Sequence, residues 1–369
     1  MVRSAGGERI TADYCRGGDL GGGIGHPWEG ERVSVIVPVL NERNRLLPCL
    51  EGLIAQGAEV AEILVVDGGS DDGTQQFVCT YAQRDPRVRL LDASPIPPDW
   101  NGKAWGLQVG LCSASPDTNW ILTVDADVRP SAPLTLALLG QAKREGLSAL
   151  SVATLQEIKG IGEGLLHPSM LTTLVYRFGM PGSVIRRVSE VQANGQCFLF
   201  RREALEACGG FQGARNSLCE DITIARTLVA SGYPIGFYEA GDLVTVKMYT
   251  DWRDTWGNWT RSLPMHDRFS GINTSLGWLE VALVQALPLP LMLSLIIMHV
   301  RCNWLIILNC VLVTIRIGVL FGTARAYQRR PWSYWLSPLC DLPVAVQLAR
   351  SALQPRHVWR GRVLVRGDM

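Results

Sequence analysis

The chain lacks a charge excess, and it lacks the cysteine patterns that mark a metal site or a disulfide framework. Its 369 residues carry 35 Lys and Arg against 34 Asp and Glu. Proteins that hold nucleic acid by its phosphates usually show a clear basic excess, so this balance argues against a nucleic-acid partner. The 10 cysteines include no Cys-x-x-Cys pair and join no histidine cluster. This argues against a zinc site and favours reduced thiols on the cytoplasmic side.

Charged residues are also few, at 19% of the chain against 47% hydrophobic residues, and the mean hydropathy is +0.12. That composition excludes a generally disordered protein. The apolar residues concentrate after residue 278. Residues 1–30 are instead Gly-rich and lack the apolar run of a signal peptide, so we expect a disordered leader.

Short β-branched runs and amphipathic segments alternate along the first half of the chain. The runs end at turn residues, which predicts buried strands, and the segments between them predict helices. Alternation at this spacing is typical of βαβ units and predicts a mostly parallel, doubly wound α/β sheet. Residues 160–190 are hard to assign. The expected strands are 33–39, 62–67, 88–92, 120–125 and 198–200, and the expected helices are 41–56, 74–84, 103–113 and 220–231.

Two long apolar runs, 279–300 and 303–322, follow the α/β part. Each is long enough to cross a hydrocarbon core, which needs about 20 residues. The less favoured alternative is a buried helical hairpin in a soluble protein. A third segment, 332–348, is shorter and interrupted by prolines and Asp341, which favours a re-entrant or interfacial segment.

Basic residues set the expected orientation of these segments. Two crossings and an interfacial third segment would keep both basic groups on the side of the large domain. The sequence therefore predicts a domain over 31–265 that faces the cytoplasm, followed by a membrane region over 266–369 with a basic cytoplasmic tail. The basic residues are Arg325, Arg329 and Arg330 after the second run, and Arg356, Arg360, Arg362 and Arg366 in the tail.

The second expected strand ends at Asp67, followed by two glycines. In an open α/β sheet, ligands bind outside the carboxyl ends of the strands. A carboxylate there can accept a hydrogen bond from the ring N–H of a base such as uracil. The alternative is a plain turn with a helix cap at Ser70 or Asp72.

Asp125 and Asp127 follow the fourth expected strand. Two carboxylates at this spacing repel each other unless a cation lies between them. A hard divalent ion such as Mg²⁺ or Mn²⁺ takes oxygen ligands, and a nucleoside diphosphate would complete its coordination. The alternative is a solvated loop.

Glu220 and Asp221 stand just before an expected helix. A carboxylate at that position is stabilised by the helix dipole, which is the alternative explanation. The functional interpretation is a general base that takes the proton of an acceptor hydroxyl.

Together these motifs resemble the family 2 glycosyltransferases, inverting nucleotide-sugar enzymes with a GT-A fold. Residues 35–42 look like the first strand and the Asn-Glu turn of that family, and 66–74 are similar to its Asp-Asp-Gly-Ser-x-Asp-Gly-Thr motif. Asp125-Ala126-Asp127 matches its metal triplet, and Glu220-Asp221 matches its base motif. Gly68 stands where many members have a second Asp, so Asp67 alone would supply the base contact.

The resemblance implies a GT-A catalytic domain with a UDP-hexose donor, Asp127 and Asp125 as ligands of Mg²⁺ or Mn²⁺, and Asp221 as the catalytic base. Lys103 would pair with the diphosphate, or else be a solvated lysine at a helix start. Asn194 and Gln196 would bind sugar hydroxyls, or else make ordinary strand hydrogen bonds. The implied nucleotide-sugar contacts are Pro38, Asn41, Glu42, Asp67, Lys103, Asp125, Asn194, Gln196, Glu220, Trp259 and Arg261.

A narrower likeness lies in residues 97–105, 194–197 and 359–362. They look like the membrane-bound members that act on carotenoids, hopanoids or sphingolipid-type acceptors, with the carotenoid 2'-O-glycosyltransferases closest. The implied partner is a membrane-embedded lipid alcohol, a carotenoid by preference. A hopanoid, a glycerolipid, a polyprenyl phosphate and a non-catalytic membrane adaptor remain as alternatives.

Processive polysaccharide synthases carry a Gln-x-x-Arg-Trp motif after the base, whereas this chain has Trp-Arg-Asp-Thr-Trp-Gly-Asn-Trp-Thr-Arg-Ser over residues 252–262. The difference favours transfer of a single sugar. Trp256, Trp259 and Arg261 would cover the diphosphate and acceptor. An amphipathic helix on the membrane surface explains them equally well.

Overall fold

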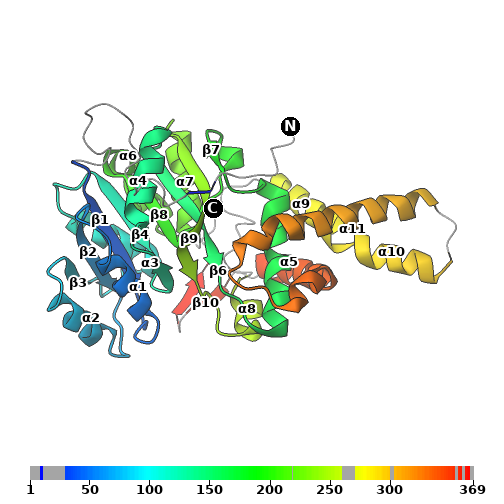
Figure 1. Ribbon diagram of the computed structural model, residues 1–369, viewed down its shortest axis with the longest axis horizontal. Helices are drawn as coiled ribbons and strands as arrows, with labels where there is room; N and C mark the ends of the chain where they lie inside the picture. Colours follow the sequence, from blue (N-terminus) through cyan, green and yellow to red (C-terminus); the bar gives the residue numbers. More distant parts are fainter. Residues whose placement is uncertain are drawn as a thin grey trace. The chain divides into compact units, whose positions relative to one another are not determined.

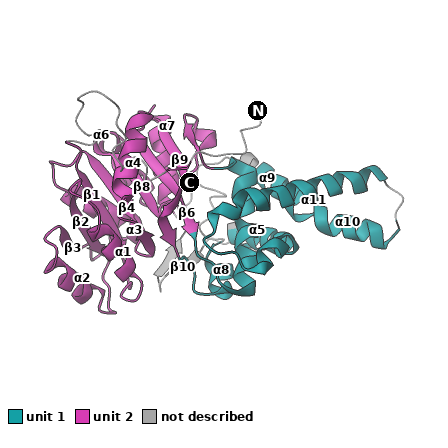
Figure 2. Ribbon diagram, in the orientation of Figure 1, with its two compact units in different colours: residues 1–5, 156–180, 247–357 teal, residues 6–155, 181–246, 358–369 magenta. Residues whose placement is uncertain are grey.

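The computed structural model describes residues 9–10, 30–217, 219–259, 271–299, 303–353, 356–359 and 362–365. The chain forms two compact units (Figure 2). Unit 2 comprises residues 6–155, 181–246 and 358–369, and unit 1 comprises 1–5, 156–180 and 247–357. Arg261 and most of the expected leader lie outside the described residues. Within that leader, Ile10 is buried and its backbone N–H donates to the Glu239 carbonyl at 3.0 Å.

Unit 2 is built on a nine-stranded sheet (Figure 1), in which eight strands follow the order β3-β2-β1-β4-β8-β6-β9-β5 and β7 pairs with β9. The first four strands in this order run parallel, as predicted from the alternation of strands and helices. The strands are β1 Val33–Val39, β2 Val60–Asp67, β3 Val88–Asp92, β4 Trp120–Val124, β5 Val128–Pro130, β6 Ala149–Gln156, β7 Ser183–Ile185, β8 Cys197–Arg201 and β9 Ile235–Val246.

The second half of the sheet contains four antiparallel pairs. Strand β8 runs against both β4 and β6, and β9 runs against both β5 and β7. The predicted α/β class is therefore confirmed, and the parallel, doubly wound part is the half that carries β1 to β4. This half brings the carboxyl ends of β1, β2 and β4 to one edge of the sheet.

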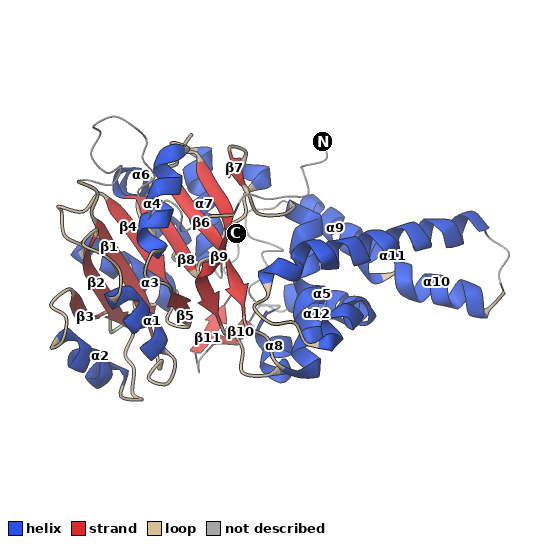
Figure 3. Ribbon diagram, viewed as in Figure 1, coloured by secondary structure: helices blue, strands red, loops and turns tan. Residues whose placement is uncertain are grey.

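Helices cover the sheet of unit 2 (Figure 3). Helix α3 packs closely on β1, because a Cβ at Gly110 would lie 2.4 Å from Ile36 and one at Gly106 would lie 3.3 Å from Pro38. This packing brings the first turn of α3 to the carboxyl edge of the sheet. The helices are α1 Leu46–Ile54, α2 Thr74–Ala82, α3 Gly102–Ser113, α4 Leu134–Arg144, α6 Arg202–Ala207 and α7 Glu220–Ala230.

Unit 1 is helical. Residues 160–178, which had no clear assignment from the sequence, form a 19-residue helix with Pro168 inside it. The helices are α5 Gly160–Phe178, α8 Trp252–Asn258, α9 Gly271–Glu280, a π-helical turn Val281–Ala286, α10 Pro288–Ile297, α11 Asn303–Thr323, a 3-10 segment Trp332–Cys340 and α12 Asp341–Leu353. Two short strands, β10 Arg356–Trp359 and β11 Arg362–Val365, pair with each other near the end of the chain.

Helix α11 lies beside α10 in unit 1 (Figure 1) and is long and apolar enough to cross a membrane. In the structure, the predicted span 279–300 is not one straight helix. Residues 275–286 and 288–297 form two helical pieces that meet at 47°. Pro288 and Pro290 follow the bend, and proline removes a helix hydrogen bond and crowds the preceding turn. The two pieces together still have the length and apolarity of one broken span.

Helix α11 buries three of its polar residues and exposes many of its large apolar residues. Asn309, Arg316 and Thr323 are buried at seven-residue spacing. The exposed side consists of large apolar residues, including Trp304, Ile307, Leu308, Val311, Ile315 and Phe321. A helix at the surface of a soluble protein has the opposite pattern.

Residues 332–348 have the same inverted polarity. Ser337 and Asp341 are buried, whereas Trp332, Trp335, Leu336, Leu339, Leu342 and Val346 are exposed. Asp341 pairs with Arg316 of α11 at 2.8 Å, and both side chains are 3% exposed. Ser169 Oγ and Gln285 Nε2 also donate to the Asp341 carboxylate, so four segments of unit 1 meet at this residue.

Candidate active site

Lys103 links two of the predicted acidic positions. Its Nζ lies 2.7 Å from Asp125 Oδ1 and 2.7 Å from Glu220 Oε1. Burial lowers the pKa of Lys103, but the carboxylates of Asp125, Glu220 and Asp221 together raise it above its ordinary value. The ammonium group is therefore held by carboxylates, and it joins the end of β4 to the start of α7.

Gly195 lies at the centre of this group. A Cβ at Gly195 would be 3.1 Å from Glu220 Oε1 and 3.2 Å from both Asp221 Cβ and Lys103 Nζ. The backbone N–H of Gly195 donates to Asp221 Oδ2 at 2.7 Å. A side chain at this position would push the charged groups apart. The sequence analysis quoted Gly195 within 194–197 but assigned roles only to its neighbours, although a glycine between two polar residues was the available signal.

The pKa of Asp221 is raised toward neutral pH. Burial, followed by the charge of Glu220, raises the pKa of Asp221 to about 7, against the opposing effects of Lys103 and two backbone hydrogen bonds. One of those bonds comes from Gly195 and the other from the N–H of Ile222 at 2.8 Å. A base is most effective when its pKa lies near the working pH.

Asp125 and Asp127 occupy the turn after β4, where the Val128 N–H donates to the Asp125 carbonyl at 3.1 Å. Burial raises the pKa of Asp127 to about 7, with further contributions from Asp125 and Glu42. Such crowded carboxylates are stabilised by a divalent cation, which takes oxygen ligands. Within the described part of the chain, no cluster of three or more His, Cys, Asp or Glu residues is placed to hold a metal. The pair therefore fits Mg²⁺ or Mn²⁺ only if diphosphate and water oxygens supply the remaining ligands.

Asp67 is turned into its own loop. Its side chain has no exposed surface. Oδ2 accepts from the N–H groups of Gly69 and Ser70 and from Gln75 Nε2 at 2.7 Å, and Oδ1 accepts from Ser70 Oγ. Both carboxylate oxygens thus accept hydrogen bonds from neighbouring residues of the chain. This arrangement is the plain turn that was the alternative to a base contact.

Asn41 and Glu42 join the loops after β1 and β2. Asn41 has a left-handed φ of 56°, and its Oδ1 accepts from the Asp71 N–H at 3.0 Å. The Glu42 N–H donates to Thr74 Oγ1 at 3.0 Å. Because of this connection, α1 begins at Leu46 and not at residue 41, where the sequence predicted its start. Pro38 lies in β1 beneath α3, as described above.

Asn194 and Gln196 hydrogen-bond to each other and to strand residues. Gln196 Oε1 accepts from Thr154 Oγ1 at 2.6 Å and from Asn194 Nδ2 at 3.1 Å. The Gln196 carbonyl accepts from the Asp125 N–H at 3.0 Å. Asn194 and Gln196 thus make the ordinary strand hydrogen bonds that were the alternative to sugar contacts. The Gln196 carbonyl also holds Asp125 in place.

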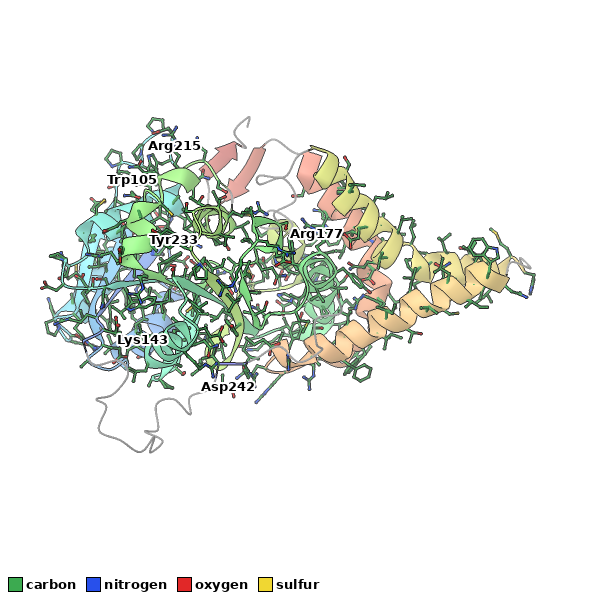
Figure 4. All side chains as sticks on the ribbon, turned by 90° about the horizontal axis from the view of Figure 1, so that it is seen from above. Trp105, Lys143, Arg177, Arg215, Tyr233 and Asp242 are labelled. Atoms are coloured by element: carbon green, nitrogen blue, oxygen red, sulfur yellow. The ribbon has the colours of Figure 1, made fainter. Side chains whose placement is uncertain are left out.

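The segment 97–105 connects the loops around the site. The Asn101 N–H donates to the Arg215 carbonyl at 2.6 Å, and Asn101 Nδ2 donates to the Ser217 carbonyl at 2.5 Å. Trp105 Nε1 donates to the Ala93 carbonyl at 2.8 Å. Trp105 and Arg215 are both labelled on unit 2 in Figure 4. These bonds connect the start of α3, with Lys103, to the loop that precedes Glu220.

Trp259 belongs to unit 1, where it is buried and stacked on His167 with ring centres 4.9 Å apart. Arg261 lies outside the described residues. The structure thus brings together Lys103, Asp125, Glu220 and Asp221 in unit 2, around Gly195.

Residues 34–209 match the sequence profile described as "Glycosyl transferase family 2". Over this segment the chain is similar to the family 2 glycosyltransferases. The family 2 match includes Lys103, Asp125, Asp127 and Gly195, and Glu220 and Asp221 follow its end. The predicted resemblance to this family is therefore confirmed.

Curated relatives include the 4,4'-diaponeurosporenoate glycosyltransferases of Staphylococcus aureus strains USA300 and MRSA252. Each is 28% identical over 240 residues, which cover 63% of this chain and 60% of the relative. The chain thus matches these curated relatives over less than two thirds of their length.

A solved structure with a similar fold is the mannosyltransferase PcManGT from Pyrobaculum calidifontis, in complex with GDP-Man and Mn²⁺. It is 20% identical with a TM-score of 0.51, over 89% of this chain and 87% of that one. This similarity supports the predicted GT-A fold.

Proposed function

We propose that this protein is an inverting glycosyltransferase. It transfers a single sugar from a nucleotide-sugar, a UDP-hexose, to the hydroxyl of a membrane lipid, a carotenoid. The observation that carries the proposal is the position of Lys103 between Asp125 and Glu220, with Asp221 beside it and Gly195 leaving the space between them open. This arrangement supports a metal-ligating role for Asp125 and the role of base for Asp221 around one small volume.

Asp221 removes the proton from the acceptor hydroxyl as that oxygen attacks the anomeric carbon. The attack comes from the face opposite the leaving nucleoside diphosphate, so an α-linked donor gives a β-linked product. The bond between the anomeric carbon and the phosphate oxygen breaks as the new bond forms. A pKa of about 7 leaves much of Asp221 ionised at neutral pH, which suits this role.

The charge of the leaving group is balanced by residues on the other side of Gly195. Lys103 places its ammonium group beside the predicted diphosphate position, and Asp127 and Asp125 would hold Mg²⁺ or Mn²⁺ there. When bound, such an ion withdraws charge from the leaving diphosphate. Gly195 keeps the base and Lys103 close without a side chain between them.

The inverted polarity of α11 and residues 332–348 supports a membrane location. Exposed apolar residues and a buried ion pair are stable where hydrocarbon surrounds the helices. We propose two crossings, an interfacial segment at 332–348 and a catalytic domain on the cytoplasmic side. A carotenoid alcohol stays in the bilayer, so its transferase must act there. The Staphylococcus relatives are named for 4,4'-diaponeurosporenoate, which is a carotenoid carboxylate and not an alcohol, so their name supports a carotenoid acceptor but not its hydroxyl.

The role of Asp221 is tested with the full chain in detergent, with UDP-hexoses, Mn²⁺ and a lipid extract. Asp221→Asn should lower UDP release and lipid glycosylation by about 10²- to 10⁴-fold, because the amide cannot take a proton. UDP binding should change little. Asp117→Asn, an exposed carboxylate at the amino end of β4, is the matched control.

Two outcomes would overturn parts of the proposal. Near-parental turnover of Asp221→Asn would indicate an acceptor that is already an anion, such as a polyprenyl phosphate. No UDP release from any donor and lipid would indicate a non-catalytic adaptor. Expression in a carotenoid-producing host, followed by mass analysis for an added hexose or deoxyhexose, identifies the acceptor.

A further inference from the structure

We infer that the carboxyl end of α11 carries a binding surface for the headgroups of anionic phospholipids. Its ligand is the phosphodiester of a bilayer lipid with a net negative charge, such as phosphatidylglycerol. This inference rests on the membrane location in the proposed function, and it adds a preference between lipids that a membrane span alone does not require. The surface, here called the Arg-Trp rim, consists of Phe321, Arg325, Arg329, Arg330, Trp332 and Trp335.

The Arg-Trp rim lies where α11 would leave the hydrocarbon. The 21 residues of Asn303–Thr323 extend over about 31 Å, at 1.5 Å for each residue. A hydrocarbon core is about 30 Å thick, so the residues that follow Thr323 fall at the level of the headgroups. Tryptophan and arginine are the residue types that this level of a membrane favours on the cytoplasmic side.

The charge of this region has one sign. The sequence contains no Asp or Glu over residues 281–340. Asp341 is buried and paired with Arg316, so its charge is not offered to the surface. The rim therefore presents a net positive charge to its surroundings. Its exposed arginines are Arg325, Arg329 and Arg330.

Buried tyrosines fix the rim on the rest of unit 1. Tyr327 is 3% exposed and Tyr334 is fully buried. Tyr334 OH donates to the Leu320 carbonyl at 2.6 Å, and the Gln328 N–H donates to the Gln156 carbonyl at 3.0 Å. The rim is therefore preformed, and a lipid that binds there has little of the chain to order.

The segment that begins at Gln156 also brings charged residues toward the rim. Glu157 pairs with Lys159 at 2.7 Å, so this neighbour adds no net charge. The positive charge of the three arginines is thus kept.

Aromatic rings and guanidinium groups lie together in the rim. The rings of Phe321 and Trp335 have their centres 4.9 Å apart, and Trp332 is 65% exposed. Arg330 Nη1 donates to the Ala324 carbonyl at 2.6 Å, which holds this guanidinium at the end of α11. The rings can pack beside the glycerol and upper acyl carbons, while a planar guanidinium binds two phosphate oxygens at once. The rim thus matches both the apolar and the charged part of a lipid headgroup region.

This chemistry predicts selectivity for the net charge of the lipid. An arginine close to an anionic membrane surface contributes about fivefold to binding, so we expect the three to favour an anionic lipid by roughly tenfold to a hundredfold. Phosphatidylcholine carries the same phosphate, but its choline cancels the charge. High salt should weaken the preference, because exposed charges are screened.

The experiment uses the full chain in a nonionic detergent and counts the lipids that it retains from an equimolar mixture of phosphatidylglycerol and phosphatidylcholine, by native mass spectrometry. The parent should retain phosphatidylglycerol in excess. A triple glutamine variant should lose this excess, and a triple lysine variant, which keeps the charge, should retain most of it. The variants are Arg325→Gln with Arg329→Gln and Arg330→Gln, and Arg325→Lys with Arg329→Lys and Arg330→Lys.

Two further variants separate lipid binding from folding and from total charge. Arg329→Gln alone leaves the bond from Arg330 to Ala324 in place and should lower the lipid ratio by about fivefold. The matched control removes three exposed arginines from unit 2 and should leave the ratio unchanged. It combines Arg84→Gln, Arg186→Gln and Arg187→Gln.

Three results would overturn the inference. Equal retention of the two lipids by the parent removes the preference, and an unchanged preference in Arg329→Gln and in the triple glutamine variant removes the rim as its source. Displacement of the lipid by an excess of inorganic phosphate would indicate a site for a free anion. In all three cases the donor and Asp221 are not involved, so the proposed transfer reaction stands. A parent that is absent from the membrane fraction removes the membrane location, and this inference with it.

Discussion

The Nζ of Lys103 lies 2.7 Å from the carboxylate of Glu220, although the two residues belong to helices far apart in the chain. The same nitrogen contacts Asp125 at the end of β4. This pairing connects the first turn of α3 to the first turn of α7, next to Asp221. The distance between the predicted metal ligand Asp125 and the predicted base Asp221 therefore depends on the ammonium group of Lys103.

Gly195→Ala should inactivate the protein without unfolding it. The new methyl group would lie 3.1 to 3.2 Å from Glu220, Asp221 and Lys103, so these side chains must shift. A displacement of this kind can cost about a hundredfold in rate. Turnover and the midpoint of thermal unfolding are the two measurements.

Gly213→Ala is the matched control, because a Cβ there would meet nothing within 4 Å. We expect near-parental turnover from it. If Gly195→Ala is as active as this control, the close approach around Gly195 has no part in the reaction.

The rate should depend on the ionisation of Asp221. Because the pKa of Asp221 is raised to about 7, the basic form is lost as pH falls below that value. Activity should therefore rise with pH through about 7 and then level off. Profiles of kcat against pH measure the midpoint.

Two variants should move this midpoint in opposite directions. Glu220→Gln removes a like charge and should lower it, whereas Lys103→Gln removes an opposite charge and should raise it. Any residual activity suffices to fix the midpoint. Equal midpoints in all three proteins would exclude Asp221 as the titrating group.

The buried Arg316–Asp341 pair should hold unit 1 together. Asp341→Leu would leave the Arg316 charge buried without its partner, which typically destabilises a protein by about 3–5 kcal/mol. Arg316→Met combined with Asp341→Leu removes both charges and should recover much of that loss. Thermal unfolding in detergent measures the difference, with Thr314→Val on the exposed side of α11 as control. A double variant no more stable than Asp341→Leu would contradict this account.

Val311→Arg tests whether the exposed side of α11 faces lipid. Val311 is 50% exposed, near the middle of the helix. In water, an arginine there would be harmless or increase solubility. In a bilayer it should cost about 3 kcal/mol and lower the yield of membrane-inserted protein. Membrane fractionation of the parent, Val311→Arg and Val311→Leu distinguishes the two cases, and normal insertion of the arginine variant would argue against a lipid-facing helix.

Local sequence patterns were sufficient for the parallel half of the sheet. Buried β-branched runs end at 39, 67 and 124 in the structure, close to the predicted boundaries. The antiparallel pairs were not predicted, because the pairing of β8 with β4 and β6 joins residues distant in the chain. Helix α5 was missed since Pro168 and several glycines interrupt its pattern, and α1 starts late because of the left-handed Asn41.

The amino-acid sequence by itself determined which acids stand at strand and helix ends, because hydrophobic period and turn residues are local properties. Only the tertiary structure decided what those acids touch. It buried Asp67 in its own loop and closed Lys103 between Asp125 and Glu220. Contacts of this kind depend on how separate elements pack, and packing distance cannot be read from spacing along a chain.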